Sequence, residues 1–207
     1  MLSEQTIEKL KSMRLHGLAE AYIEQEKNSS MSSISFEERL GMLIDRQWTH
    51  QENAALQRRL KNAQLKQSNA NIENLSYRGD RDLKPQLISQ LSTCNYIRNG
   101  QHCIITGQTG TGKTYLSCAL GNKACREAFK VKYFYAPQLF RELQAAELDG
   151  TLSKFIRRLS KFDLIIIDDW GINELKLNPC RSLLELIDER MEKSFIISSQ
   201  LSNRILA

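Results

Sequence analysis

The chain has 207 residues, of which 41% are hydrophobic and 26% charged, as in an ordinary globular protein with one main core and a smaller second unit. No apolar run approaches the roughly 20 residues of a membrane span, and the N-terminus lacks the apolar segment of a signal peptide, so we expect a cytoplasmic protein without a membrane partner. The five cysteines form no C-x-x-C pair, which predicts reduced thiols, and the net charge of +5 is compatible with an anionic polymer partner.

The N-terminal third of the chain is predicted to be helical. Apolar residues recur at helical spacing over residues 3–27, and a polar stretch then interrupts the pattern. Ser35 followed by Glu38 is a capping box, which predicts the start of a second helix that continues to about residue 67.

This second helix has faces of different character. Phe36 and Ile44 begin an apolar face, and Trp48 is expected in the core. The stretch 56–69 instead carries four basic side chains and no acid. These are Arg58, Arg59, Lys61 and Lys66. They could form a face that binds nucleic-acid phosphates, whereas an ordinary solvated helix face is the more common origin of such a charge pattern.

Residues 68–84 have the polar composition of a linker. We therefore expect a helical N-terminal region, residues 1–69, that contacts DNA or a partner, and a second region over residues 70–207. The stretch 85–98 is predicted to be a helix that leads into the first strand of this second region.

The motif around which the chain is organised is H-C-I-I-T-G-Q-T-G-T-G-K-T, from His102 to Thr114. It fills every fixed position of the P-loop pattern G-x-x-x-x-G-K-S/T, with an apolar strand before it and a helical stretch after it. Glycines let the backbone aim its N–H groups at a phosphate, a lysine reaches the β- and γ-phosphates, and a threonine hydroxyl ligates Mg²⁺. The residues expected to bind ATP are Gly107, Gln108, Thr109, Gly110, Thr111, Gly112, Lys113 and Thr114, with Thr114 also on the metal.

The next elements alternate between strand and helix. A strand is predicted over residues 130–136, helices over 139–148 and 152–159, and a buried parallel strand at the aliphatic run that ends in Asp168 and Asp169. Ligands bind at the carboxyl ends of such strands. Asp168 is therefore expected to hold Mg²⁺, and Asp169 is expected to orient the attacking water.

A helix is predicted over residues 179–192, followed by a last buried strand over 194–200. A strand that lies between the P-loop strand and the Asp168 strand typically ends in a polar residue that senses the γ-phosphate or the water. Gln200 is the candidate for this catalytic role, and Ser199 is the second choice.

Taken together, these segments resemble the IstB-like ATP-binding proteins, the helper ATPases of a transposition system, which are related to the DnaC-type helicase loaders within the AAA+ class. The resemblance rests on L-K-S-M-R-L-H-G-L-A-E-A near the N-terminus, Y-L-S-C-A-L-G after the P-loop, L-I-I-I-D-D-W-G and I-I-S-S-Q-L. It implies a homo-oligomer that binds ATP between neighbouring subunits, assembles on DNA largely without sequence preference, bends it and recruits a transposase. It also favours the DNA-contact interpretation of the basic face.

The resemblance predicts an α/β fold of the AAA+ P-loop type, a parallel sheet flanked by helices. In this family a fifth strand and an arginine that acts on the neighbouring subunit follow the sensor strand, whereas this chain ends seven residues after Gln200. We therefore expect the C-terminal part of the module to be missing and assign no such role to Arg204, which leaves ATP hydrolysis open. The alternatives are a DnaC-type helicase loader and an ATP-binding adaptor that does not hydrolyse.

Overall fold

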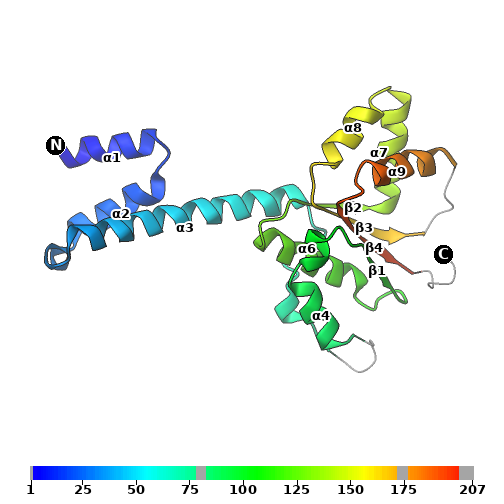
Figure 1. Cartoon of the computed structure of the whole chain (residues 1–207), viewed down its shortest axis with the longest axis horizontal. Coiled ribbons are helices and arrows are strands. Elements are labelled where there is room, and N and C mark those ends of the chain that lie inside the picture. Colours follow the sequence, from blue (N-terminus) through cyan, green and yellow to red (C-terminus); the bar gives the residue numbers. More distant parts are fainter. Residues whose placement is uncertain (1, 78–82, 172–176, 201–207) are drawn as a thin grey trace. The chain divides into compact units, whose positions relative to one another are not determined.

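The computed structural model describes residues 2–77, 83–171 and 177–200 (Figure 1). The chain divides into two compact units, Met1–Arg58 and Arg59–Ala207. The division falls within a helix and not after residue 69, because the segment that follows Arg58 packs with the second unit.

The first unit consists of helices. Its elements are α1 (Leu2–Ser12), α2 (His16–Lys27), η1 (Ser29–Ser33) and the larger part of α3 (Phe36–Ala63). The capping box at the start of α3 is confirmed, since the Glu38 N–H donates to Ser35 Oγ at 3.2 Å and the Ser35 N–H donates to Glu38 Oε2 at 3.3 Å.

The prediction of one continuous helix over residues 3–27 is wrong. Arg14 adopts a left-handed conformation with φ of 62°, and the Leu15 N–H donates to the Leu10 carbonyl at 2.9 Å. This bond closes α1 before α2 begins. The close approach of α2 to α3 depends on Gly17, because a Cβ at this position would lie 2.9 Å from the Arg46 carbonyl oxygen.

The apolar face expected on α3 is largely exposed. Phe36 is 65% exposed, Ile44 54% and Trp48 66%, so the expectation that Trp48 joins the core is wrong. The contact between α2 and α3 instead uses a polar side chain, since the Leu18 N–H donates to Gln47 Oε1 at 3.0 Å.

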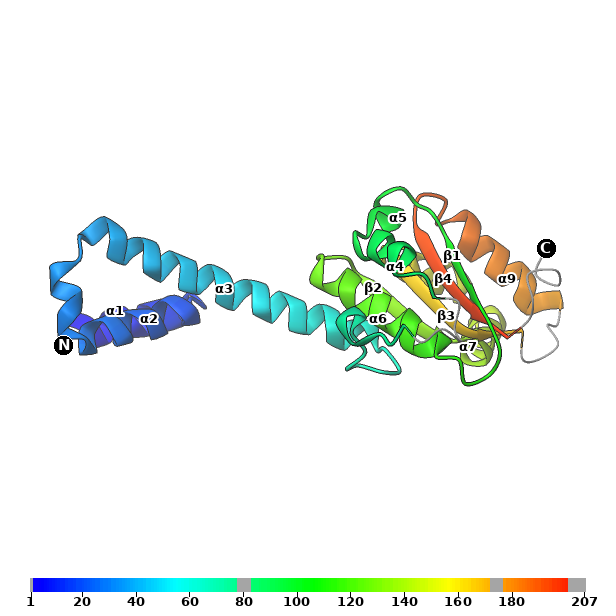
Figure 2. The same cartoon turned by 90° about the horizontal axis from the view of Figure 1, so that it is seen from below.

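The second unit contains a parallel sheet in the order β1-β4-β3-β2, with helices on both faces (Figures 1 and 2). The elements are η2 (Ile72–Asn74), α4 (Pro85–Ser92), α5 (Asn95–Arg98), β1 (Cys103–Thr106), α6 (Lys113–Arg126), β2 (Val131–Tyr135), α7 (Ala136–Leu148), α8 (Leu152–Leu159), β3 (Leu164–Trp170), α9 (Leu177–Asp188) and β4 (Ser194–Ser199). This arrangement confirms the predicted parallel sheet flanked by helices.

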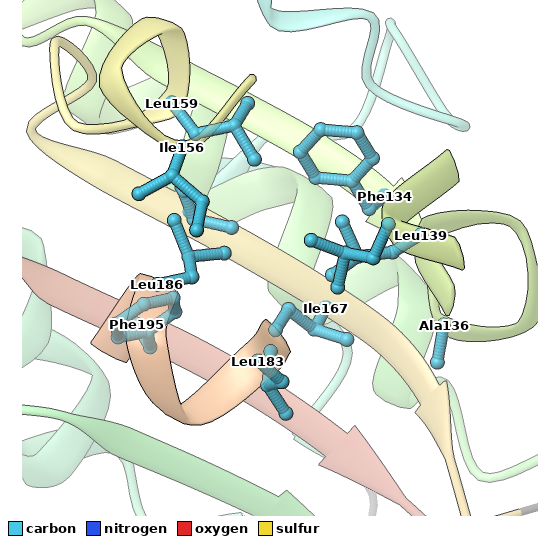
Figure 3. Close-up of a cluster of buried hydrophobic side chains, with 11 residues drawn as sticks. Phe134, Ala136, Leu139, Ile156, Leu159, Ile167, Leu183, Leu186 and Phe195 are labelled. Atoms are coloured by element: carbon cyan, nitrogen blue, oxygen red, sulfur yellow. The ribbon is translucent and has the colours of Figure 1, made fainter. Parts of the chain in front are cut away.

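One face of the sheet carries a hydrophobic core cluster, between β2, β3 and β4 and the helices α7, α8 and α9 (Figure 3). Aliphatic residues of β3 project into it, and Leu183 and Leu186 close it from α9. Helix α6 covers the other face and contacts all four strands. The four aliphatics of β3 are buried on both sides, which is why this strand reads as a continuous apolar run in the sequence.

The segment predicted as a linker packs against α6. Asn122 Nδ2 donates to the Ser68 carbonyl at 3.2 Å, and Arg126 donates to Asn71 Oδ1 at 2.6 Å. The predicted helix over residues 85–98 is two helices, because Cys94 takes a left-handed conformation with φ of 57° between α4 and α5.

A buried arginine ties the end of α9 to its surroundings. Arg190 is 1% exposed and donates to the carbonyls of Leu159, Phe162 and Ser194. Its guanidinium also lies over the ring of Phe195, 4.9 Å from the ring centre. Burial lowers the pKa of Arg190 to about 10, so the group remains charged at neutral pH.

All five cysteines are free. In the part of the chain that the structure describes, no helix is long and apolar enough to cross a membrane. The residues after Gln200, on which the expectations about the C-terminal part and Arg204 rest, lie outside the described residues.

Candidate nucleotide-binding site

The P-loop runs from the end of β1 to the first turn of α6, as its motif predicts. Gly110 and Gly112 have φ of 83° and 94°, a left-handed conformation that side chains with a Cβ rarely adopt. The Gly107 N–H donates to the Ser199 carbonyl at 3.3 Å, which joins the loop to the end of β4. The loop therefore leads directly into the N-terminus of α6, where the first N–H groups of a helix favour a bound anion.

The Lys113 side chain is held close to this loop. It is buried, and its ammonium donates to the carbonyls of Gly107 and Gln108, each at 2.8 Å. An ammonium has three protons, so two of them fix its position while the third can reach a further acceptor. This arrangement places a positive charge at the loop predicted to hold phosphate.

Asp168 is the most enclosed acid of the site, with 0% exposure. Its Oδ2 accepts hydrogen bonds from the Thr114 hydroxyl at 2.8 Å and the Tyr133 hydroxyl at 2.7 Å, and its Oδ1 accepts one from Ser198. The structure thus brings together the two residues predicted to bind Mg²⁺. Burial and the bond to Asp168 raise the pKa of Tyr133, so its hydroxyl stays protonated and remains a donor.

A bulge in β3 places Asp169. Ile167 pairs with Ile197 and Trp170 with Ser199, so Asp168 and Asp169 together lie opposite one residue, Ser198. Asp169 has φ of 60°, and its N–H donates to Ser198 Oγ at 3.1 Å in place of a ladder bond. Such bulges redirect side chains beside active sites. Here the bulge lets two consecutive carboxylates meet different partners, Thr114 at Asp168 and Lys66 at Asp169.

The sensor candidates at the end of β4 differ in their contacts. Gln200 is exposed and reaches the P-loop, because Thr109 Oγ1 donates to its Oε1 at 2.8 Å. Ser199 donates to the Trp170 carbonyl at 2.9 Å and therefore binds the end of β3. The structure thus places the first candidate beside the predicted phosphate loop.

The four basic residues predicted to contact DNA have different environments. Arg58 and Lys61 are exposed. Arg59 Nε donates to the Cys125 carbonyl at 2.9 Å near the end of α6, and Lys66 lies 3.9 Å from Asp169 Oδ2. Two of the four therefore bind protein groups, and Lys66 approaches the predicted catalytic acid.

A small pocket lies beside the P-loop. Its volume is about 240 Å³, and residues from the segment after η2 line it together with the loop and α6, including Leu75, Lys113 and Tyr115. This is less than the roughly 300–1,000 Å³ of a site that encloses a whole drug-sized ligand, which fits a pocket for one part of a nucleotide, such as the base.

Sequence reasoning did not identify Leu75, Tyr133 or Ser198 as residues of the site. Leu75 lies in a segment that reads as linker, and Tyr133 lies in a strand that reads as ordinary core. The only signal for Ser198 is its position near the carboxyl end of a strand adjacent to β3, where ligands bind in parallel sheets.

Comparisons with known proteins show the family of this chain. The family model described as IstB-like ATP binding protein matches residues 8–204. The chain belongs to the IstB-like ATP-binding proteins. It is 39% identical to an ATP-binding protein of insertion sequence IS1162 from Pseudomonas fluorescens, with 97% of this chain and 87% of that protein aligned. It is 37% identical to an insertion-sequence ATP-binding protein of Sinorhizobium fredii, with 97% of this chain and 82% of that protein aligned.

Solved structures of the AAA+ class share the fold of this IstB-like chain. AMPPCP-bound DnaA from Aquifex aeolicus aligns with a TM-score of 0.54 and 22% identity, over 67% of this chain and 46% of that one. The DnaC helicase loader aligns with a TM-score of 0.55 and 20% identity, over 65% and 78%. The predicted AAA+ P-loop fold and the predicted family are both confirmed.

Proposed function

We propose that this IstB-like protein binds ATP with Mg²⁺ and hydrolyses it, as the DNA-binding helper of a transposase. The observation that carries the ATP chemistry is the hydrogen bond between the Thr114 hydroxyl and Asp168, at 2.8 Å. Thr114 directly follows Lys113 of the P-loop in the chain. The names of the insertion-sequence relatives support the context of transposition.

The donor set at this contact fits Mg²⁺. A threonine hydroxyl and a carboxylate offer oxygen ligands, which this small, hard cation prefers. We assign the metal to Thr114 and Asp168, with Tyr133 and Ser198 holding the carboxylate in place. Bound there, Mg²⁺ would neutralise charge on the β- and γ-phosphates.

The remaining residues bind the phosphates and orient the attacking water. The backbone N–H groups of the loop and the Lys113 ammonium bind the phosphates, and Asp169 orients a water molecule towards the γ-phosphorus. The water oxygen bonds to phosphorus, the bond to the β–γ bridging oxygen breaks, and the water protons leave with inorganic phosphate and the medium, which gives ADP. Gln200, held by Thr109, is positioned to respond to this change at the loop.

We further propose that the protein works in the cytoplasm as a homo-oligomer on DNA, together with a transposase. Arg58 and Lys61 are exposed and can reach phosphates, whereas Arg59 serves mainly to hold α6 through Cys125. A DnaC-type helicase loader has the same fold, so the protein partner distinguishes the two functions.

The nucleotide site is tested by titrating a fluorescent ATP analogue into wild-type and Lys113→Ala protein. Charge-assisted hydrogen bonds contribute about 1.5–3 kcal/mol each, so the variant should bind about ten- to a hundredfold more weakly. Equal affinities would contradict the assignment.

The transposition context is tested with a purified transposase of an insertion sequence that encodes a related ATP-binding protein. Reconstituted strand transfer into a target plasmid should require this protein and ATP, and Lys113→Ala protein should not support it. Stimulated loading of a replicative helicase, with no effect on strand transfer, would favour the loader function instead.

A further inference from the structure

A cleft of about 1,040 Å³ lies beside β2, the strand at one end of the sheet order. Residues 61–66 form one wall, and β2 with residues of α7 and α8 forms the other. Asp169, at the bulge of β3, also lines this cleft. The cleft therefore extends from the surface to the carboxylate that we assign to the attacking water.

The charges that line the cleft are mainly positive. The cationic residues are Lys61, Lys66, Lys132 and Arg158, against the acids Glu142 and Asp169. The Lys132 ammonium donates a hydrogen bond to Gln64 Oε1 on the opposite wall, and burial lowers its pKa.

Aromatic rings accompany two of these cations. The Lys66 ammonium lies 5.7 Å from the centre of the Tyr135 ring, and the Lys132 ammonium lies 5.7 Å from that of Phe134. Cations on both walls, interleaved with aromatic rings, are the pattern that binds a nucleic-acid strand through its phosphates and bases.

Lys66 connects this cleft to Asp169, the carboxylate assigned to the attacking water. Its Nζ lies 3.9 Å from Asp169 Oδ2, and the side chain is 51% exposed whereas that of Asp169 is 22% exposed. An ammonium at this position competes with water for one carboxylate oxygen. Because the pair is partly exposed and long, it can be separated at little cost in free energy.

We propose that this cleft binds a phosphodiester strand of DNA and that Lys66 couples its occupancy to Asp169. The inference rests on the proposed function and adds a DNA site on the ATPase unit and its effect on hydrolysis. A phosphate in the cleft attracts the Lys66 ammonium, and Asp169 Oδ2 is then available to accept a hydrogen bond from the attacking water. DNA therefore accelerates the hydrolysis of ATP to ADP and phosphate.

The cleft is tested by fluorescence anisotropy with a labelled oligonucleotide, either single-stranded or annealed to its complement, over a range of salt concentrations. Each phosphate contact that is removed should lower the slope of log K against log salt by about 0.9 on duplex and about 0.7 on a single strand. The double variant Lys132→Gln with Arg158→Gln should therefore lose about two contacts. The matched control is Lys123→Gln. This change breaks the ion pair between Lys123 of α6 and Glu127, which directly follows the helix, and both residues lie outside the cleft, so the slope should stay at the wild-type value.

The coupling is tested by phosphate release from Lys66→Gln protein. Without DNA this variant should hydrolyse ATP several-fold faster than wild type, with unchanged affinity for ATP, and DNA should stimulate it less than twofold. Lys66→Arg, which keeps the charge, should retain the low basal rate and the stimulation by DNA. Lys123→Gln should match wild type in both assays.

The outcomes separate this inference from the proposed function. A wild-type protein that binds no DNA would contradict both. Binding of DNA with unchanged slopes in the double variant would overturn the cleft alone. An oligonucleotide whose slope falls by about two contacts in the double variant is a ligand of the cleft, and one whose slope does not change is not. Lys66→Gln protein that hydrolyses ATP no faster than wild type would overturn the coupling, even if every contact to DNA is confirmed.

Discussion

The hydroxyl of Thr114 and the carboxylate of Asp168 lie 2.8 Å apart, although 54 positions separate them in the chain. Thr114 lies in the first turn of α6, directly after the P-loop, and Asp168 lies near the carboxyl end of β3. The parallel order of β1, β4 and β3 brings both ends to the same edge of the sheet.

This contact predicts how ATP binding depends on magnesium. Asp168→Asn keeps the shape of the side chain but removes the charge, so the Mg²⁺-dependent part of the affinity for ATP should be lost. Titration of a fluorescent ATP analogue in Mg²⁺ and in EDTA should give similar affinities for the variant and different affinities for wild type. A variant with the full response to Mg²⁺ would contradict the metal assignment.

Asp169 is expected to act in hydrolysis and not in binding. Proton transfer and water orientation by a positioned side chain contribute about 10²–10⁴-fold to a rate, so Asp169→Asn should reduce phosphate release by at least about a hundredfold. The affinity for ATP should remain within about twofold of wild type, as measured by the same titration. An equal loss in binding and in turnover would instead indicate a structural role for this carboxylate.

Gly121 is predicted to be favoured over larger residues by close packing. A Cβ there would lie 2.6 Å from Ile166 Cδ1 and 2.9 Å from Leu65 Cδ2, so Gly121→Ala should destabilise the second unit by about 1–3 kcal/mol despite the better helix propensity of alanine. Gly41 in α3 has no atom within 4 Å of such a Cβ, and Gly41→Ala should be neutral or stabilise by up to about 1 kcal/mol. Urea unfolding followed by circular dichroism measures both. A stabilising Gly121→Ala would refute the close packing.

The buried thiol of Cys125 predicts a loss of stability at alkaline pH. Burial raises its pKa from 9.0 to about 11, so the neutral thiol is favoured in the folded state. The contribution of this thiol to the free energy of unfolding is therefore fully present below pH 9 and is lost as the pH rises towards 11. Between pH 8 and pH 10, wild type should lose about 1–2 kcal/mol more than Cys125→Ala, as measured by urea unfolding at each pH. Parallel pH profiles for the two proteins would exclude this effect.

Local sequence was sufficient for the P-loop and for the acids at the end of β3. The P-loop is contiguous, and glycines at Gly110 and Gly112 are required by backbone conformation alone. Asp168 and Asp169 follow an aliphatic run whose length and β-branched content predict a buried parallel strand. In both cases one short segment contains the whole signal.

Tertiary structure decided what surrounds those acids. Tyr133 and Ser198 come from the neighbouring strands β2 and β4, and only the sheet order brings their hydroxyls to Asp168. The bulge that separates Asp169 from Asp168 follows from the pairing register of β3 with β4, and Lys66 reaches Asp169 because its segment packs in the same unit. No spacing within one segment encodes these contacts, since each depends on how distant parts of the chain share a core.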